Sequence, residues 1–208
     1  MDPRQRRAQL LDAAAAVFAE KGYHQAKIDD FVARVGVARG TFYLYFEDKR
    51  SIFEELVDRF MERLMDAIVP IELGDPDVNA RQALRANLLR VVERFDAEPA
   101  LAKILLSTAV GIDPGFDQKL LGFYDAITAL LERALDQGVT AGLVRPGPTR
   151  IRSFCLVGLL KELLYQLLLR DLAIPPGDLV DALLDLLERG LFVAPKPPVG
   201  ITPGHETS

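Results

Sequence analysis

Residues 28–49, with the sequence IDDFVARVGVARGTFYLYFEDK, constrain the fold of this chain more than any other segment. The first half predicts a short helix, because apolar residues recur there at helical spacing. The members of that apolar face are Ile28, Phe31, Val32 and Val35. Gly36 follows where helices commonly end in the left-handed conformation, and a second helix is expected over residues 39–46. Two helices joined by a tight glycine-containing turn form a helix-turn-helix, whose second helix fits the major groove of DNA.

The predicted second helix has one apolar face and one face suited to DNA. Phe42 and Phe46 are four residues apart, so they share the face that packs on the first helix. Arg39 is on another face, where a guanidinium can contact guanine O6 and N7 together. The hydroxyl groups of neighbouring Thr and Tyr residues suit phosphates or base edges, and Leu44 suits a thymine methyl. Gly40 leaves room for the backbone to approach a phosphate.

Lys49 follows Asp48, which is a good N-cap residue for the next helix. A cation in the first turn opposes the dipole of its own helix, which points to an external anion such as a phosphate. The alternative interpretation of the whole segment is an ordinary surface helix with unpaired charges and additional aromatic residues. Helix-turn-helix geometry also occurs in proteins that do not bind DNA, so the pattern alone favours DNA only modestly.

Residues 4–63 resemble the DNA-binding domain of the tetracycline-repressor (TetR) family of bacterial transcription regulators. The segments that carry the resemblance are AAAAVFAEKGY and VGVARGTFYLYFEDKRSIFEELV. The resemblance implies an all-helical homodimer that binds a palindromic operator and has a ligand pocket in its C-terminal domain. Three positions depart from the family pattern: Lys27 and Ala38 stand where hydroxyl residues usually cap the two helices, and Leu44 replaces a more frequent polar residue.

We therefore expect a set of residues around the second helix to contact DNA. They are Lys27, Ala38, Arg39, Gly40, Thr41, Tyr43, Leu44, Tyr45 and Lys49. The three departures leave the half-site sequence of the operator open.

The charge of the chain is unevenly distributed. The net charge is −5, which on its own argues against DNA. Residues 1–50, however, carry a slight excess of Lys and Arg, whereas the remainder is acidic. A basic N-terminal unit on an acidic body is expected of a DNA-binding head on a regulatory domain. We expect residues 1–9 to form a short basic arm before the first helix, either solvated or in contact with DNA.

Other composition features bear on the cellular setting and the chemistry. Cys155 is the only cysteine, which excludes an internal disulfide and suits a reducing cytosol. The N-terminus has no apolar segment, and the densest apolar run, residues 154–169, is too short for a membrane span. We therefore expect a cytoplasmic protein with no membrane partner. His and Cys residues do not recur at metal-ligand spacing, so we expect neither a metal nor a cofactor.

Apolar residues at helical spacing predict an all-α fold. The resemblance implies that it divides into an N-terminal three-helix helix-turn-helix DNA-binding domain and a C-terminal helical ligand-binding and dimerisation domain. We assign residues 1–50 to the first domain, which continues into a long helix over residues 49–69. Residues 51–193 form the regulatory and dimerisation domain, and residues 194–208 a disordered tail. Further helices are expected over residues 78–97, from 99 to 111, up to 137, and over 149–171 and 178–191.

The last two predicted helices are the most apolar in the chain, and the first of them is apolar on nearly all faces. A helix of that kind must be buried on all sides, and a symmetric partner is the simplest cover. A four-helix interface with two helices from each subunit would result, although a wholly intrachain core is the alternative. The residues that we expect in the dimer interface are Phe154, Val157, Leu160, Leu164, Leu168, Leu183 and Leu187.

A ligand between such helices would occupy a mainly apolar pocket with a few polar groups. The candidate lining residues are Phe60, Leu64, Phe95, Leu105, Ser107, Phe123, Tyr124 and Tyr165. Ordinary core packing is the alternative for each of them. Because Lys and Arg do not cluster at one spot, we expect a mostly hydrophobic small molecule.

The sequence therefore predicts a ligand-responsive DNA-binding transcription regulator, most simply a repressor that a hydrophobic small molecule releases from a palindromic operator. An activator of the same fold is an alternative. An α-helical enzyme is disfavoured, because the chain has neither a glycine-rich phosphate loop nor a catalytic constellation.

Overall fold

The computed structural model of the chain describes residues 2–73, 79–108 and 114–192, without the side chains of Ser107 and Thr108. The expected tail over residues 194–208 lies outside this part. The described residues are helical, as predicted, with one isolated bridge between Val144 and Phe192. The elements are α1 (Pro3–Gln25), α2 (Ile28–Val35), α3 (Arg39–Phe42), α4 (Lys49–Asp66), α5 (Ala80–Ala97), α6 (Pro99–Lys103), the π-helical turn η1 (Ile104–Thr108), α7 (Pro114–Thr140), α8 (Thr149–Arg170) and α9 (Pro176–Gly190).

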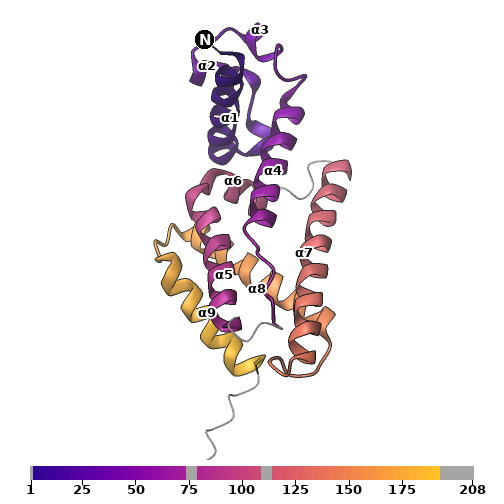
Figure 1. The fold of residues 1–208 in the computed structure, drawn as a ribbon. Coiled ribbons are helices and arrows are strands. Elements are labelled where there is room, and N and C mark those ends of the chain that lie inside the picture. The colour runs from indigo at the N-terminus through magenta and orange to yellow at the C-terminus, as the bar shows by residue number, and fades with distance from the viewer. Residues whose placement is uncertain (1, 74–78, 109–113, 193–208) are drawn as a thin grey trace, which may run out of the picture.

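The molecule has a head and a body (Figure 1). Helices α1, α2 and α3 gather at one end, and α5, α7, α8 and α9 form the other end. Helix α4 runs from the first group toward the second. This arrangement makes α4 a rod that joins the helix-turn-helix to the body, and α1 also packs against α6 and η1.

The first helix begins earlier than the sequence pattern indicates. Pro3 occupies its first turn, where the missing N–H costs nothing, and the Asp2 side chain accepts a hydrogen bond from the Arg4 amide at 3.1 Å. The expected arm over residues 1–9 is therefore wrong, because the chain is helical from Pro3 onward. Gly22, with φ of 74°, kinks the last turn of α1.

The helix-turn-helix is present with a shorter second helix than predicted. Gly36 ends α2 in the left-handed conformation, with φ of 74° and ψ of 39°. Helix α3 has only four residues, whereas we expected a helix over residues 39–46. The amides of Leu44 and Tyr45 bond to carbonyls three residues back, at 3.3 and 3.0 Å, so the chain continues as tight turns.

Aromatic side chains form the core of the head. The Phe18 ring packs edge-on against Phe31 and Phe53, with centroids 5.1 and 5.0 Å apart. Phe42 from α3 is fully buried and lies beside Phe31. Such pairs stabilise a core beyond their burial alone, so α1, α2, α3 and α4 are held as one unit.

Helix α4 is fixed to the body near its C-terminal end. Asn87 of α5 donates to the Val69 carbonyl at 2.8 Å and accepts from the Val69 amide at 2.9 Å. Arg90 donates to the Ala67 carbonyl at 2.8 Å. Farther along the rod, Phe60 packs edge-on against Phe95 of α5, with centroids 5.3 Å apart. A movement of α5 would therefore displace α4 and, through it, the head.

The remaining helices follow the predicted order with small differences at their ends. Helix α4 ends at Asp66 rather than near residue 69, and α7 extends to Thr140 rather than to residue 137. The segment after α6 widens into the π-helical turn η1, which the apolar pattern did not predict. Turns of this kind insert one extra residue per turn and occur frequently at functional sites.

Candidate nucleic-acid interface

The face of the head opposite its aromatic core carries most of the residues predicted to contact DNA. Arg39 and Gly40 are exposed, Tyr43 is 49% exposed and Leu44 is 78% exposed. Thr41 and Tyr45 are half-buried beside them. A Cβ at Gly40 would meet no other atom within 4 Å, so the backbone there is open to close approach. An exposed leucine between hydroxyl and guanidinium groups suits a groove edge that offers both methyl and polar groups.

The position of this face is set by the segment that follows α3. Phe42 and Phe46 are buried with ring centroids 5.6 Å apart, as their spacing predicted. The Arg7 guanidinium lies over the Phe46 ring, 4.8 Å from its centroid, and pairs with Glu55 of α4. Sequence reasoning missed Arg7 and Glu55 in this role, because they are far apart in the chain and match no local pattern.

Arg39 is already engaged in the free protein. Its Nη1 lies 3.2 Å from both carboxylate oxygens of Asp29, and its Nη2 donates to the Tyr43 hydroxyl at 3.4 Å. The hydrogen bond to Tyr43 and then the charge of Asp29 raise the pKa of Arg39 above its ordinary value. Asp29, at the start of α2, was also missed by the sequence reasoning.

Helices α2 and α3 both start without a hydroxyl cap, and they differ in what replaces it. The Lys27 amide donates to Asp30 at 2.9 Å, and Lys21 donates to the same carboxylate at 2.8 Å. Both contacts, led by that of Lys21, lower the pKa of Asp30. Ala38 offers no side-chain cap to α3, and only its carbonyl accepts from the Thr41 amide, at 2.9 Å. Helix α3 is therefore held mainly by packing.

Lys49 is placed differently from the expectation. Its ammonium donates to the carbonyls of Tyr23 and Ala26 at 2.7 and 3.1 Å, near the end of α1. It also lies 4.5 Å from the centroid of the Tyr23 ring. Burial lowers the pKa of Lys49. The partner that we sought in an external phosphate is internal in this structure, where the ammonium joins the start of α4 to the end of α1.

The residues predicted to line a ligand pocket are packed in the body or at its edge. Phe60, Leu64, Phe95 and Leu105 are buried, whereas Phe123, Tyr124 and Tyr165 are half-buried. The Ser107 side chain lies outside the described part. Burial raises the pKa of Tyr124, and the Lys161 ammonium lies 5.1 Å from the centroid of its ring.

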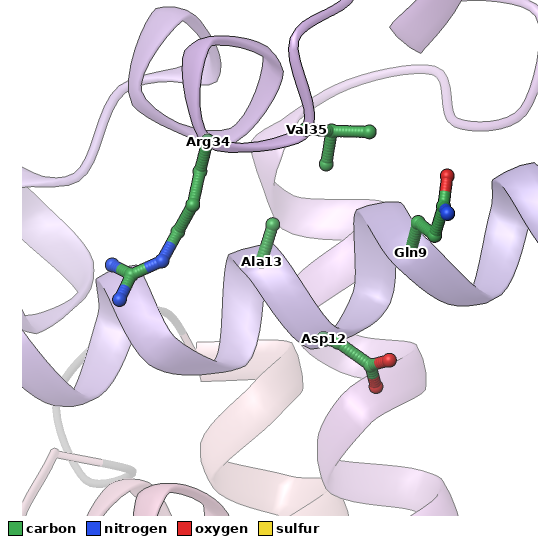
Figure 2. A pocket seen from close by; sticks show the side chains of 5 residues that line it. All are labelled: Gln9, Asp12, Ala13, Arg34 and Val35. Carbon is green, nitrogen blue, oxygen red and sulfur yellow. The ribbon is translucent and has the colours of Figure 1, made fainter.

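Two hollows in the described surface lie away from these residues. Figure 2 shows one between α1 and α2, where Arg34 and Val35 lie above Gln9, Asp12 and Ala13. A second lies where α1 and α4 meet the α5–α6 corner, with Arg59, Arg63 and Glu98 among its lining residues. Neither contains a residue from the predicted pocket.

The residues predicted for a dimer interface divide into three groups. Phe154 is 50% exposed, and Leu164 and Leu183 are buried by their own chain. The half-buried members are Val157, Leu160, Leu168 and Leu187. Other apolar residues on the same two helices are more exposed than any of these: Ile151, Leu169 and Leu186.

In the described residues 2–73, 79–108 and 114–192, no helix combines the length and apolar character needed to cross a membrane. The same part of the chain holds no group of His, Cys, Asp or Glu side chains that could bind a metal ion.

A three-helix head with a buried aromatic core and an exposed face on α3 has the architecture of a helix-turn-helix domain. Residues 10–56 match the family described as bacterial regulatory proteins, tetR family. The fatty acid metabolism regulator protein of Bacillus subtilis (strain 168) is 25% identical over 192 residues, which are 88% of this chain and 94% of that protein.

Solved structures extend the similarity to the body. The fatty acid degradation regulator FadR from Bacillus halodurans has a TM-score of 0.69 at 25% identity, covering 88% of this chain and 98% of that one. FadR from Bacillus subtilis, in complex with stearoyl-CoA, has a TM-score of 0.68 at 25% identity, covering 86% and 96%. Residues 10–56 therefore carry the helix-turn-helix region of the TetR family of transcription regulators, and the chain as a whole is similar to FadR. These matches are to DNA-binding regulators rather than to enzymes.

Proposed function

We propose that this regulator is a cytoplasmic repressor that binds a palindromic operator as a homodimer and is released by a long-chain fatty acyl-CoA. The observation that carries the proposal is the similarity along nearly the whole chain to a fatty acid metabolism regulator, body included. The division into a DNA-binding head over residues 1–50 and a regulatory body over residues 51–193 is part of the same proposal.

The exposed face of α3 supports the DNA-binding part. Arg39 and Tyr43 present a guanidinium and a phenol beside the open backbone of Gly40. These groups suit guanine, phosphate oxygens and base edges in a major groove. Thr41, Leu44 and Tyr45 complete the proposed contact surface.

The exposed apolar residues of α8 and α9 support the dimer. Ile151 and Phe154 of α8 are 60% and 50% exposed, and Leu186 of α9 is 57% exposed. Patches of this kind on paired helices suit a second copy of the same surface. Because the chain itself covers Leu164 and Leu183, we place the contact on the outer face of these helices instead.

The apolar body supports an acyl ligand. We propose that the fatty chain inserts among the candidate residues around Phe60 and Phe95, where α4 meets α5. The half-buried Tyr124 and Tyr165 would lie near its polar end. A packed core has to open for such a ligand, so the ligand must select a body conformation that differs from the DNA-binding one.

The release mechanism follows from the connection between α5 and α4. Both heads of a dimer can bind only if their α3 helices reach successive major grooves, about 34–36 Å apart. A ligand-selected shift of α5 would pass through the Asn87 and Phe95 contacts to α4 and change that distance. A tenfold loss of DNA affinity needs only about 1.4 kcal/mol of coupling.

The DNA-binding part is tested with a gel-shift assay on the intergenic DNA upstream of the gene. We expect saturable binding that weakens with salt. Arg39→Ala and Tyr43→Ala should each weaken binding to this DNA about tenfold or more while the oligomeric state is unchanged. Unaltered binding by both variants would remove α3 from the proposed interface.

The effector part is tested by adding stearoyl-CoA to the preformed complex, with coenzyme A alone as the control. We expect stearoyl-CoA to weaken DNA binding at least tenfold and coenzyme A to have no effect. An equal response to both compounds, or to neither, would refute the proposed effector class.

A further inference from the structure

Asp29 is the one acidic group of the described residues that contacts the proposed recognition arginine. It occupies the first turn of α2 with its side chain 63% exposed, and both of its oxygens lie 3.2 Å from Arg39 Nη1. The next residue, Asp30, is engaged instead by Lys21 and by the Lys27 amide. Asp29 therefore differs from its neighbour in having the recognition side chain as its ion-pair partner.

Arg39 can donate hydrogen bonds to a base while it remains paired with Asp29. A guanidinium has five N–H groups in one plane, and the contacts to Asp29 and Tyr43 occupy only Nη1 and Nη2 hydrogens. The Nε hydrogen and the remaining Nη hydrogens stay available to an acceptor. A free arginine side chain loses considerable rotamer entropy when it binds, so fixing its orientation in advance favours one mode of contact over others.

The Asp29 carboxylate also lowers the affinity for DNA. Asp29 stands on the face that we propose meets the DNA, where its charge opposes nearby phosphates on any sequence. This repulsion is offset only on a sequence whose base fits the fixed orientation of Arg39. Repulsion on all sequences together with a gain on one sequence raises specificity rather than affinity.

We infer that Asp29 is a positioning residue for DNA specificity: it holds Arg39 in one orientation and weakens binding to sequences that this orientation does not fit. The inference rests on the proposed DNA-binding function. It assigns a role to a residue that makes no base contact of its own.

The experiment begins with a duplex that the wild-type protein selects from a random-sequence pool. Fluorescence anisotropy then gives the affinity for that duplex, for each of its single-base-pair variants and for a scrambled duplex. The variants are Asp29→Asn, Asp29→Glu, Arg39→Ala and the double variant of Asp29→Asn with Arg39→Ala. Glu20→Gln is the matched control, because it removes one exposed carboxylate of the head that pairs with Arg34 away from α3.

We expect Asp29→Asn to bind the scrambled duplex more tightly and to lower the selected-to-scrambled affinity ratio about two- to fivefold, as an exposed ion pair allows. The loss of discrimination should fall on the base pairs that Arg39→Ala also ceases to distinguish. Asp29→Glu should keep the ratio near the wild-type value. Glu20→Gln should leave the ratio unchanged, and Asp29→Asn should not change it further once Arg39 is absent.

An unchanged ratio in Asp29→Asn, or the same fall in the Arg39→Ala background, would overturn the inference. Circular dichroism checks that each variant is folded, and a folded Asp29→Glu that loses discrimination as Asp29→Asn does would also count against it. Failure of the wild type to select any duplex would instead refute the proposed function, so the two failures are distinguishable.

Discussion

Lys49 shows how one side chain stabilises the junction of three helices. Its ammonium lies over the Tyr23 ring and bonds to carbonyls at the C-terminal end of α1, while its backbone begins α4. These carbonyls follow the kink at Gly22. The cation therefore fixes the angle between the head helices and the rod.

We predict that Lys49→Met lowers the free energy of unfolding by about 1–3 kcal/mol, because part-buried carbonyls lose a charged donor. Urea denaturation followed by circular dichroism measures this change. Arg50→Ala is the control, since Arg50 forms an exposed pair with Glu54 one turn away and should cost less than 1 kcal/mol. Equal effects of the two substitutions would contradict the assigned role of Lys49.

The pKa of Asp30 determines how one contribution to the stability of the head depends on pH. The hydrogen bond from Lys21, followed by that from the Lys27 amide, lowers the pKa of Asp30 from its ordinary 3.8. A lowered pKa in the folded state means that the carboxylate stabilises the fold above the unfolded-state pKa, and that this contribution is lost as the pH falls through the folded-state pKa.

We therefore predict that the stability difference between the wild type and Asp30→Asn is largest above about pH 4, the ordinary range of an aspartate. The difference should shrink as the pH falls further. Urea titrations at a series of pH values measure it. A difference that stays constant into strong acid would mean that the capping carboxylate is not responsible.

The helices differ in how well the sequence predicted their bounds. Helix α2 was predictable, because its apolar face and the left-handed Gly36 are local features. The end of α3 was not, because the sequence stays compatible with a helix up to Phe46. There the packing of Phe42 and Phe46, with Arg7 over the second ring, fixes turns instead. The turn η1 likewise carries no local signal that distinguishes it from an α-helix.

The N-terminus of α3 lacks a side-chain cap. Ala38 has extended backbone angles, φ of −70° and ψ of 150°, and offers no side-chain acceptor to a helix of only four residues. Ala38→Ser should raise the free energy of unfolding by about 0.5–1 kcal/mol, because a hydroxyl can accept from a first-turn amide. Thermal denaturation measures the gain. Ala33→Ser, an exposed substitution within α2, should not stabilise the protein, and a gain there would point to a general surface effect.

For the whole molecule, the sequence predicted the helical architecture and the burial of Phe42 and Phe46 better than the contacts of the body. The all-round apolar character of α8 indicated burial but not which faces the chain itself would cover. Residue Leu164 is covered within the chain, whereas Ile151 and Phe154 are not. The links that join head and body, such as that of Asn87 with Val69, depend on distant segments meeting.

The exposed face of α8 leads to a prediction about assembly. Phe154→Asp should shift the sedimenting mass from that of a dimer to that of a single chain, because a buried unpaired carboxylate disfavours an apolar interface. Leu44→Asp, at a 78% exposed leucine of the head, is the control and should leave the mass unchanged. A wild-type protein that sediments as a single chain at micromolar concentrations would contradict the proposed dimer.

Selection of DNA from a random duplex pool, followed by sequencing, tests whether two α3 helices bind one operator together. Two copies of α3 in successive major grooves require an inverted repeat whose half-site centres are about one helical turn, 10–10.5 base pairs, or a multiple of it apart. We predict that the wild type enriches such a repeat and that Arg39→Ala does not. Enrichment of an isolated half-site, or of no motif at all, would contradict the account.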